Sequence, residues 1–111
     1  MTRDEALTRH LAEKVMGWKY CGKLGGRSVF DTGQKNVYGR MSPQPFDPLH
    51  DANDALRLLE GVKTVPQVCK HLYGRWSCYL PGRYVTERAN TPTRAICEAV
   101  GKATGFEENW R

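Results

Sequence analysis

The sequence predicts a single small α+β domain, residues 1–111, in which three main helices cover a small, mostly antiparallel sheet. Two observations lead to this class. Segments with the apolar spacing of amphipathic helices alternate along the chain with short segments rich in β-branched and aromatic residues. The length also suits one domain, because a chain of this size buries roughly two thirds of its unfolded surface. The expected element order is helix, strands, helix, strands, helix.

Each of the three predicted helices begins at a residue that can cap it and ends at a glycine. They are expected at about residues 3–16, 51–61 and 91–105. The first opens with a capping box, in which Thr2 accepts from a backbone amide and Glu5 reaches back toward the start of the helix. In the third, Pro92 takes the first helical position after the cap Thr91.

Two stretches between the helices, residues 20–46 and 62–75, are expected to be irregular inserts. Glycines punctuate the first, which predicts a small hairpin or a mobile excursion with its turn at Asp31–Gln34. In the second, apolar residues at 65, 68, 69 and 72 fit a short helix better than a strand. After it, Pro81–Gly82 predicts the turn of a β-hairpin.

Composition narrows the class of protein. A hydrophobic share of 40% with 26% charged residues is typical of globular domains. No run of about 18 apolar residues exists and the first residues are charged, so we expect neither a membrane span nor a signal peptide. The four cysteines lack a Cys-x-x-Cys pair, and in a cytosolic chain we expect them to be reduced and mostly buried.

The net charge of +5 is concentrated in two segments. Residues 19–40 and residues 61–88 each carry +4, and the acidic segment 41–60 between them carries −3. Two basic segments between helices suggest an anionic partner, although solvated loops would give the same pattern.

The sharpest candidate site is formed by basic and aromatic residues of the second basic segment, with two cations of the glycine-rich stretch 22–27 added. These predicted ligand-binding residues are Arg75, Tyr79, Arg83, Tyr84, Arg88, Lys23 and Arg27. Guanidinium groups bind phosphate and aromatic rings stack on bases, so the set suits a phosphorylated, base-bearing ligand. The alternative is that Trp76 and Tyr84 pack in the core and the arginines are merely solvated.

Other chemistry has weaker support. Residues Asp47, His50, Asp51 and Asp54 have the spacing of one helix face and could hold a cation or form an acid–base pair. Helix capping explains them better, because Pro48 breaks the helical geometry. Cys69, His71 and Cys78 lack a fourth zinc ligand. No serine has the sequence setting of a catalytic nucleophile. With none of these candidates favoured, we expect no bound metal, no cofactor and no enzyme activity.

Three segments resemble the phage ABA-sandwich domain family: Leu11–Trp18, Phe46–Asp51 with the helix after it, and Glu87–Ala99 with its Ala-Ile-Cys. The second departs from the family pattern, with Leu49 and His50 in place of Ser and Thr. The resemblance implies an α/β/α sandwich encoded by a bacteriophage or prophage, located in the cytoplasm of the infected bacterial host. It implies no catalytic residues.

Together these observations predict a non-enzymatic phage accessory protein that acts on the host, for example against a defence system. Its expected ligand is anionic, either a small nucleotide signal or an acidic host protein. The alternative is a phage protein that binds nucleic acid with weak sequence preference. We expect no membrane partner, and Trp110 in the tail is a candidate contact in a homo-oligomer.

Overall fold

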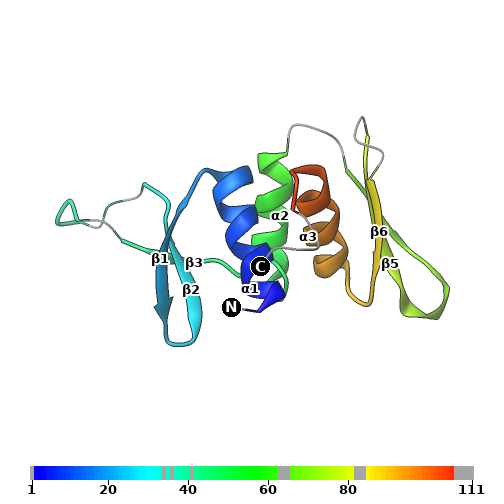
Figure 1. Cartoon of the computed structure of the whole chain (residues 1–111), viewed down its shortest axis with the longest axis horizontal. Helices are drawn as coiled ribbons and strands as arrows, with labels where there is room; N and C mark the ends of the chain where they lie inside the picture. The colour runs from blue at the N-terminus through cyan, green and yellow to red at the C-terminus, as the bar shows by residue number, and fades with distance from the viewer. Residues whose placement is uncertain are drawn as a thin grey trace.

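In the computed structural model, which describes residues 2–33, 35, 37–40, 42–62, 66–81 and 85–106, three helices lie between two small antiparallel sheets (Figure 1). The α+β class and the three helices are confirmed. The arrangement of the strands differs from the expectation, because they form two three-stranded sheets and not one. The helices therefore form a middle layer with a sheet on each side.

The helices follow the signals in the sequence closely. Helix α1 covers Arg3–Leu11 and continues as a π-helical turn over Ala12–Met16, helix α2 covers Ala52–Gly61, and helix α3 covers Pro92–Ala103. Thr2 Oγ1 accepts from the amide of Glu5 at 3.2 Å, as the capping box predicts. Gly17 ends the first helix with a φ of 71°, a conformation that glycine adopts at little cost.

The first sheet consists of β1 (Lys19–Leu24), β2 (Arg27–Asp31) and β3 (Gln44–Pro45). Gly25 and Gly26 form the turn between β1 and β2, both with positive φ. Two glycines with positive φ allow a tight turn that matches the twist of a hairpin. The predicted position of the turn, Asp31–Gln34, is therefore wrong, because the turn lies earlier. Residues 20–31 form strands where an irregular insert is expected, although the register shifts between Tyr20 and Gly22. Gln34 itself lies outside the described residues.

The second sheet consists of β4 (Gln67–Lys70), β5 (Trp76–Leu80) and β6 (Val85–Ala89). The short helix predicted within 62–75 is wrong, because residues 67–70 pair with β5 over four consecutive positions. Long-range pairing here overrides a helical spacing that arises by coincidence. The hairpin of β5 and β6 is confirmed, but residues 82–84 of its turn lie outside the described residues.

The core lies on both sides of the helical layer. On one side, the rings of Phe30 in β2 and Phe46 pack edge to face with their centroids 6.0 Å apart, and both side chains are buried. On the other, Cys78 and Leu80 of β5 are fully buried and α3 packs on β5 and β6. Each sheet thus has an inner face that the helices cover and an outer face directed away from them.

Candidate functional site

The structure does not bring the predicted site residues together. Lys23 and Arg27 lie on the hairpin of β1 and β2, whereas Arg75, Tyr79 and Arg88 lie on or beside the strands of the second sheet. The two sheets stand at opposite ends of a molecule that is 49 Å long (Figure 1). The remaining two predicted residues, at positions 83 and 84, lie outside the described residues.

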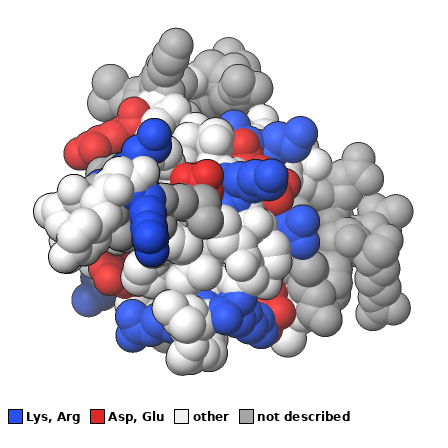
Figure 2. Space-filling view, turned by 90° about the vertical axis from the view of Figure 1, so that its left-hand side faces the viewer, with Lys and Arg blue, Asp and Glu red and all other residues white. Residues whose placement is uncertain are grey.

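At the β1–β3 end, Lys23 is occupied by an internal contact. Its Nζ lies 2.7 Å from Oε1 of Glu5, and this bond raises the pKa of Lys23 and lowers the pKa of Glu5. Glu5 therefore bonds a strand 18 residues away, and a hydrogen bond from the backbone of Thr2 also contributes to its lowered pKa, as a capping box predicts. Figure 2, which faces this end, shows Lys and Arg interspersed with Asp and Glu. The end does not present a patch of one sign.

Arg27 lines two adjoining clefts, and Asp47 and His50 line both with it. The smaller, of about 170 Å³, also borders Glu5 of α1. The larger, of about 490 Å³, borders the first turn of α2 and includes Asp54. Carboxylates outnumber cations in both linings, so neither cleft suits an anionic ligand.

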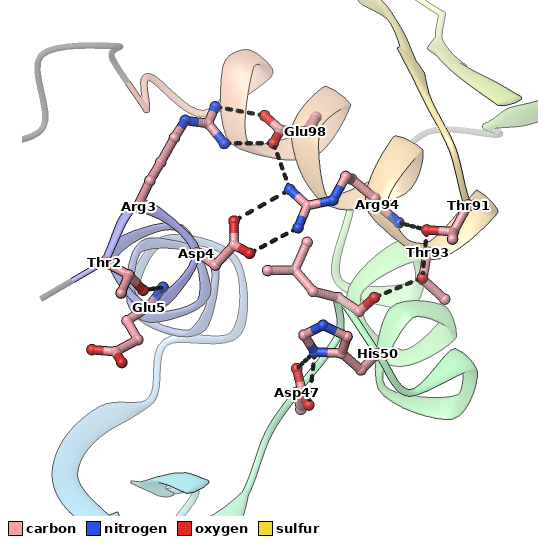
Figure 3. Close-up of polar contacts among 11 residues, drawn as sticks. Thr2, Arg3, Asp4, Glu5, Asp47, His50, Thr91, Thr93, Arg94 and Glu98 are labelled. Atoms are coloured by element: carbon pink, nitrogen blue, oxygen red, sulfur yellow. Dashed lines mark hydrogen bonds and ion pairs between the residues drawn. The ribbon is translucent and has the colours of Figure 1, made fainter. Parts of the chain in front are cut away.

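The carboxylates around these clefts have structural partners. His50 Nδ1 donates to Asp47, at 3.0 Å from Oδ1 (Figure 3). Asp51 caps α2, with Oδ1 accepting from the amide of Asn53 at 2.8 Å. Asp54 accepts from the amide of Asp47 at 2.9 Å. The capping interpretation is confirmed for Asp51, and the described residues contain no group of three or more His, Cys, Asp or Glu placed to hold a metal ion.

Next to the smaller cleft, an ionic network joins α1 to α3 (Figure 3). Arg94 bonds Asp4 at 2.8 Å and Glu98 at 3.5 Å, and Arg3 bonds Glu98 at 2.6 Å. The hydrogen bond from Arg94 lowers the pKa of Asp4. Thr93 Oγ1 also donates to the carbonyl of Leu49 at 2.7 Å, which fixes the segment before α2. These polar contacts connect α1, α3 and the segment before α2. The smaller cleft is the space left where these elements meet.

The second sheet presents the other predicted residues. Arg75 and Arg88 are exposed, and Tyr79 is half-buried. The predicted alternation is confirmed for Cys78 and Leu80, which face the helices. Neither Arg75 nor Arg88 forms a salt bridge with any residue that the structure describes. Two arginines and a tyrosine thus remain available to a partner.

Sequence reasoning missed a polar pair on this sheet. His71 Nε2 and Ser77 Oγ lie 2.6 Å apart, and Ser77 is buried although it occupies the outer side of β5. The amide of His71 donates to the carbonyl of Arg75 at 2.6 Å, which closes the loop between β4 and β5. Only the strand pairing places residues 71 and 77 side by side, and the short helix predicted within 62–75 concealed it. The pair anchors the loop that carries Arg75.

The cysteines divide into two classes. All four are free thiols. Cys78 and Cys97 are buried as predicted, and burial raises the pKa of Cys78 to about 11. Cys21 and Cys69 are exposed, so the prediction of mostly buried cysteines is wrong for these two, which lie in strands β1 and β4 at the sheet edges.

Comparison with known proteins supports the fold. No protein-family model and no curated protein matches the chain. Among solved structures, the fold is similar to the crystal structure of a phage protein from Bacillus cereus ATCC 14579, with a TM-score of 0.62 and 15% sequence identity. The match covers 96% of this chain and 94% of that one. At this identity the likeness establishes a shared fold, and the resemblance to the ABA-sandwich family stays a prediction. None of the described helices is long and apolar enough to cross a membrane.

Proposed function

We propose that this chain is a non-enzymatic phage accessory protein that binds an acidic surface of a host protein, such as a component of a defence system. The binding surface is the sheet of β4, β5 and β6 together with the loop 71–75. The fold shared with a phage protein supports the phage origin. The cytoplasm of the infected bacterium is the compartment in which such a contact would form.

One observation carries the proposal: this sheet is basic, and large apolar side chains are exposed beside its cations. Leu72 is 81% exposed and Tyr73 is 99% exposed, next to the exposed Lys70 and Arg75. Residues 66–81 contain no Asp or Glu. Arginine and tyrosine are enriched in protein interfaces, where they combine charge with a large contact area. We use the name basic sheet surface for Val68, Lys70, Leu72, Tyr73, Arg75 and Arg88. In the strand register Val68 and Lys70 lie on the side of Cys78 and Trp76, whereas Arg88 lies on the side of Ser77, so this surface extends from the outer face of the sheet around the edge of β4.

A protein partner fits the geometry better than a small nucleotide. A nucleotide requires a concave site with cations inside it. The two clefts described above lie at the opposite end of the molecule, and Asp residues line both. An exposed surface that mixes cations with apolar groups suits a complementary acidic protein face.

Nucleic acid remains the alternative, because the same cations would contact phosphates. The two hypotheses differ in their response to salt. Three cations that neutralise phosphates predict a log–log slope of about −3 for duplex DNA. A protein interface with apolar contacts should weaken less steeply, because burial of Leu72 and Tyr73 does not depend on ionic strength.

The test compares the wild type with Arg75→Glu/Arg88→Glu in crosslinking of host lysate followed by mass spectrometry. Both arginines are exposed, so the variant should fold normally. A matched control, Lys19→Glu/Lys35→Glu, makes the same change of charge at the other end of the molecule. We expect an acidic protein to crosslink to the wild type and the control but not to the double variant. Equal crosslinking to all three proteins would refute the site, and tight binding of duplex DNA with a slope near −3 would favour the alternative.

A further inference from the structure

We propose that the acidic partner contributes an extended segment that adds as a fourth strand beside β4. The inference rests on the proposed function, since the basic sheet surface selects the partner, and it specifies how the partner binds. Strand addition uses backbone hydrogen bonds for affinity and the alternating side chains for specificity.

The edge of β4 is open. The strand order is β4-β5-β6, so among the described residues β4 pairs only with β5. All four residues, Gln67–Lys70, are exposed. Their pairing with β5 is regular over four positions and has no bulge. A regular edge strand presents a row of N–H and C=O groups to any extended chain that approaches it.

The edges of the other sheet are protected. In β1 the register shifts between Tyr20 and Gly22, and lysines lie at positions 19 and 23. Bulges and edge lysines are devices that prevent strand addition. Strand β3 has only two residues, and one of them is Pro45. Strand β4 contains one lysine, Lys70, but it has neither a bulge nor a proline, so it is less protected than β1 and β3.

The side chains near β4 indicate what kind of segment would bind. Lys70 and Arg75 are exposed cations, so acidic side chains are favoured. Val68 is 38% exposed and Leu72 is 81% exposed, so apolar side chains are favoured beside the acidic ones. A second copy of this chain would bring further cations and no carboxylate to this edge, because residues 66–81 contain no Asp or Glu, so it lacks the charge complementarity of an acidic segment. Val68 and Lys70 lie two positions apart on the same face of β4. The expected occupant is therefore an extended segment in which Glu or Asp and Val or Thr stand two positions apart on the matching face.

The test uses a defined probe, a fluorescein-labelled eight-residue peptide that carries Glu and Val in turn along one face of the extended chain and Thr along the other. Binding is followed by fluorescence anisotropy and by the amide signals of residues 67–70 in nitrogen–proton NMR spectra. A matched peptide with Lys in place of Glu tests charge. A third peptide keeps every side chain but carries N-methyl groups on alternate amides, so it cannot donate to an edge strand.

We expect the Glu peptide to bind and to shift the amides of 67–70, and the Lys peptide not to bind. Loss of one or two hydrogen bonds should make the N-methylated peptide bind about tenfold more weakly, whichever variant of the protein is used. Lys70→Glu should weaken the Glu peptide, and Lys19→Glu on the other sheet should not. Val68→Pro should also weaken it, provided that the NMR spectrum shows a folded protein.

The outcomes separate the mode of binding from the proposed function. Equal binding of the Glu peptide and its N-methylated form, both weakened by Arg75→Glu, would overturn strand addition and leave an acidic partner bound through charge. Shifts confined to residues 19–31 would overturn both. A dimer of the free protein whose contacts include residues 67–70 would also overturn the inference, because the edge would already be occupied. Absence of binding by every peptide would overturn strand addition, whereas the lysate experiment would still decide the acidic partner.

Discussion

Replacing Gly101 with alanine tests the packing of α3 against Leu7 of α1. A Cβ atom at Gly101 would lie 2.7 Å from Cδ1 of Leu7, a side chain that is fully buried. Carbon atoms pack favourably at about 3.5–4.0 Å, so one of the two groups must move. Overpacking of this kind typically costs about 1–3 kcal/mol. Alanine gains up to about 1 kcal/mol over glycine in a helix, so we expect a net loss of about 1 kcal/mol.

The same substitution should have the opposite effect when Leu7 is first shortened. Leu7→Ala alone should cost about 3 kcal/mol through lost burial and a residual cavity. In that background the methyl group of Gly101→Ala enters the cavity, and the helix still gains. We expect a stabilisation of about 1 kcal/mol, which gives a coupling of roughly 2 kcal/mol between the two positions.

Urea unfolding followed by circular dichroism measures the cycle. For a domain of this size m is about 1–1.5 kcal/mol per molar urea, so each change of 1 kcal/mol moves the midpoint by roughly 0.7–1 M. Gly105→Ala is the matched control. The φ of Gly105 is 93°, which disfavours alanine, but a Cβ atom added there would have no other atom within 4 Å. The loss of stability should therefore be the same whether position 7 is leucine or alanine. An equal rise in midpoint for Gly101→Ala in both backgrounds would refute the close packing.

Three further predictions concern the polar network and the thiols. Arg94→Leu removes the bonds to Asp4 and Glu98 and should cost about 1 kcal/mol in urea unfolding, whereas Lys19→Leu should change little. The pKa of Asp4 is lowered in the folded state, so the ionised carboxylate stabilises the fold fully above the ordinary carboxyl pKa. This stabilisation is lost as the pH falls through the folded pKa. Asp4→Asn should therefore reduce the dependence of the melting temperature on pH between 2 and 5. Cys21 and Cys69 should react with a thiol reagent at pH 8 in the native protein, and Cys78 and Cys97 only after unfolding, as mass spectrometry of the labelled peptides can show.

The helices were accessible to sequence reasoning because their signals are local. Thr2 and Thr91 each bond an amide three residues ahead, and Gly17 ends a helix by its own backbone conformation. The strands depend on distant partners. Residues 67–70 become a strand only because they pair with β5, and the glycines at 25 and 26 fit a loop as well as a hairpin turn. Local patterns cannot decide between such alternatives.

The candidate site was predictable in composition but not in arrangement. The sequence identifies basic residues with aromatic neighbours, and the structure divides them between two sheets. The contacts that decide their availability are long-range. Lys23 bonds Glu5 across 18 residues, and the bond between His71 and Ser77 requires strand pairing that the spacing of side chains does not reveal. The distribution of charge along the sequence therefore shows where the cations are, but it does not show which of them form salt bridges within the fold.

The two basic segments illustrate this difference, since each carries +4 but they are used in different ways. In the first, Lys23 neutralises Glu5, and Arg27 stands beside Asp47 at a cleft with more carboxylates than cations. Its charge largely balances the acidic groups of α1 and of the segment before α2. In the second, Arg75 and Arg88 have no acidic partner among the described residues, next to an open strand edge. Exposed cations without an acidic partner contribute little to the stability of the fold, and the proposed acidic partner would give Arg75 and Arg88 a role in binding.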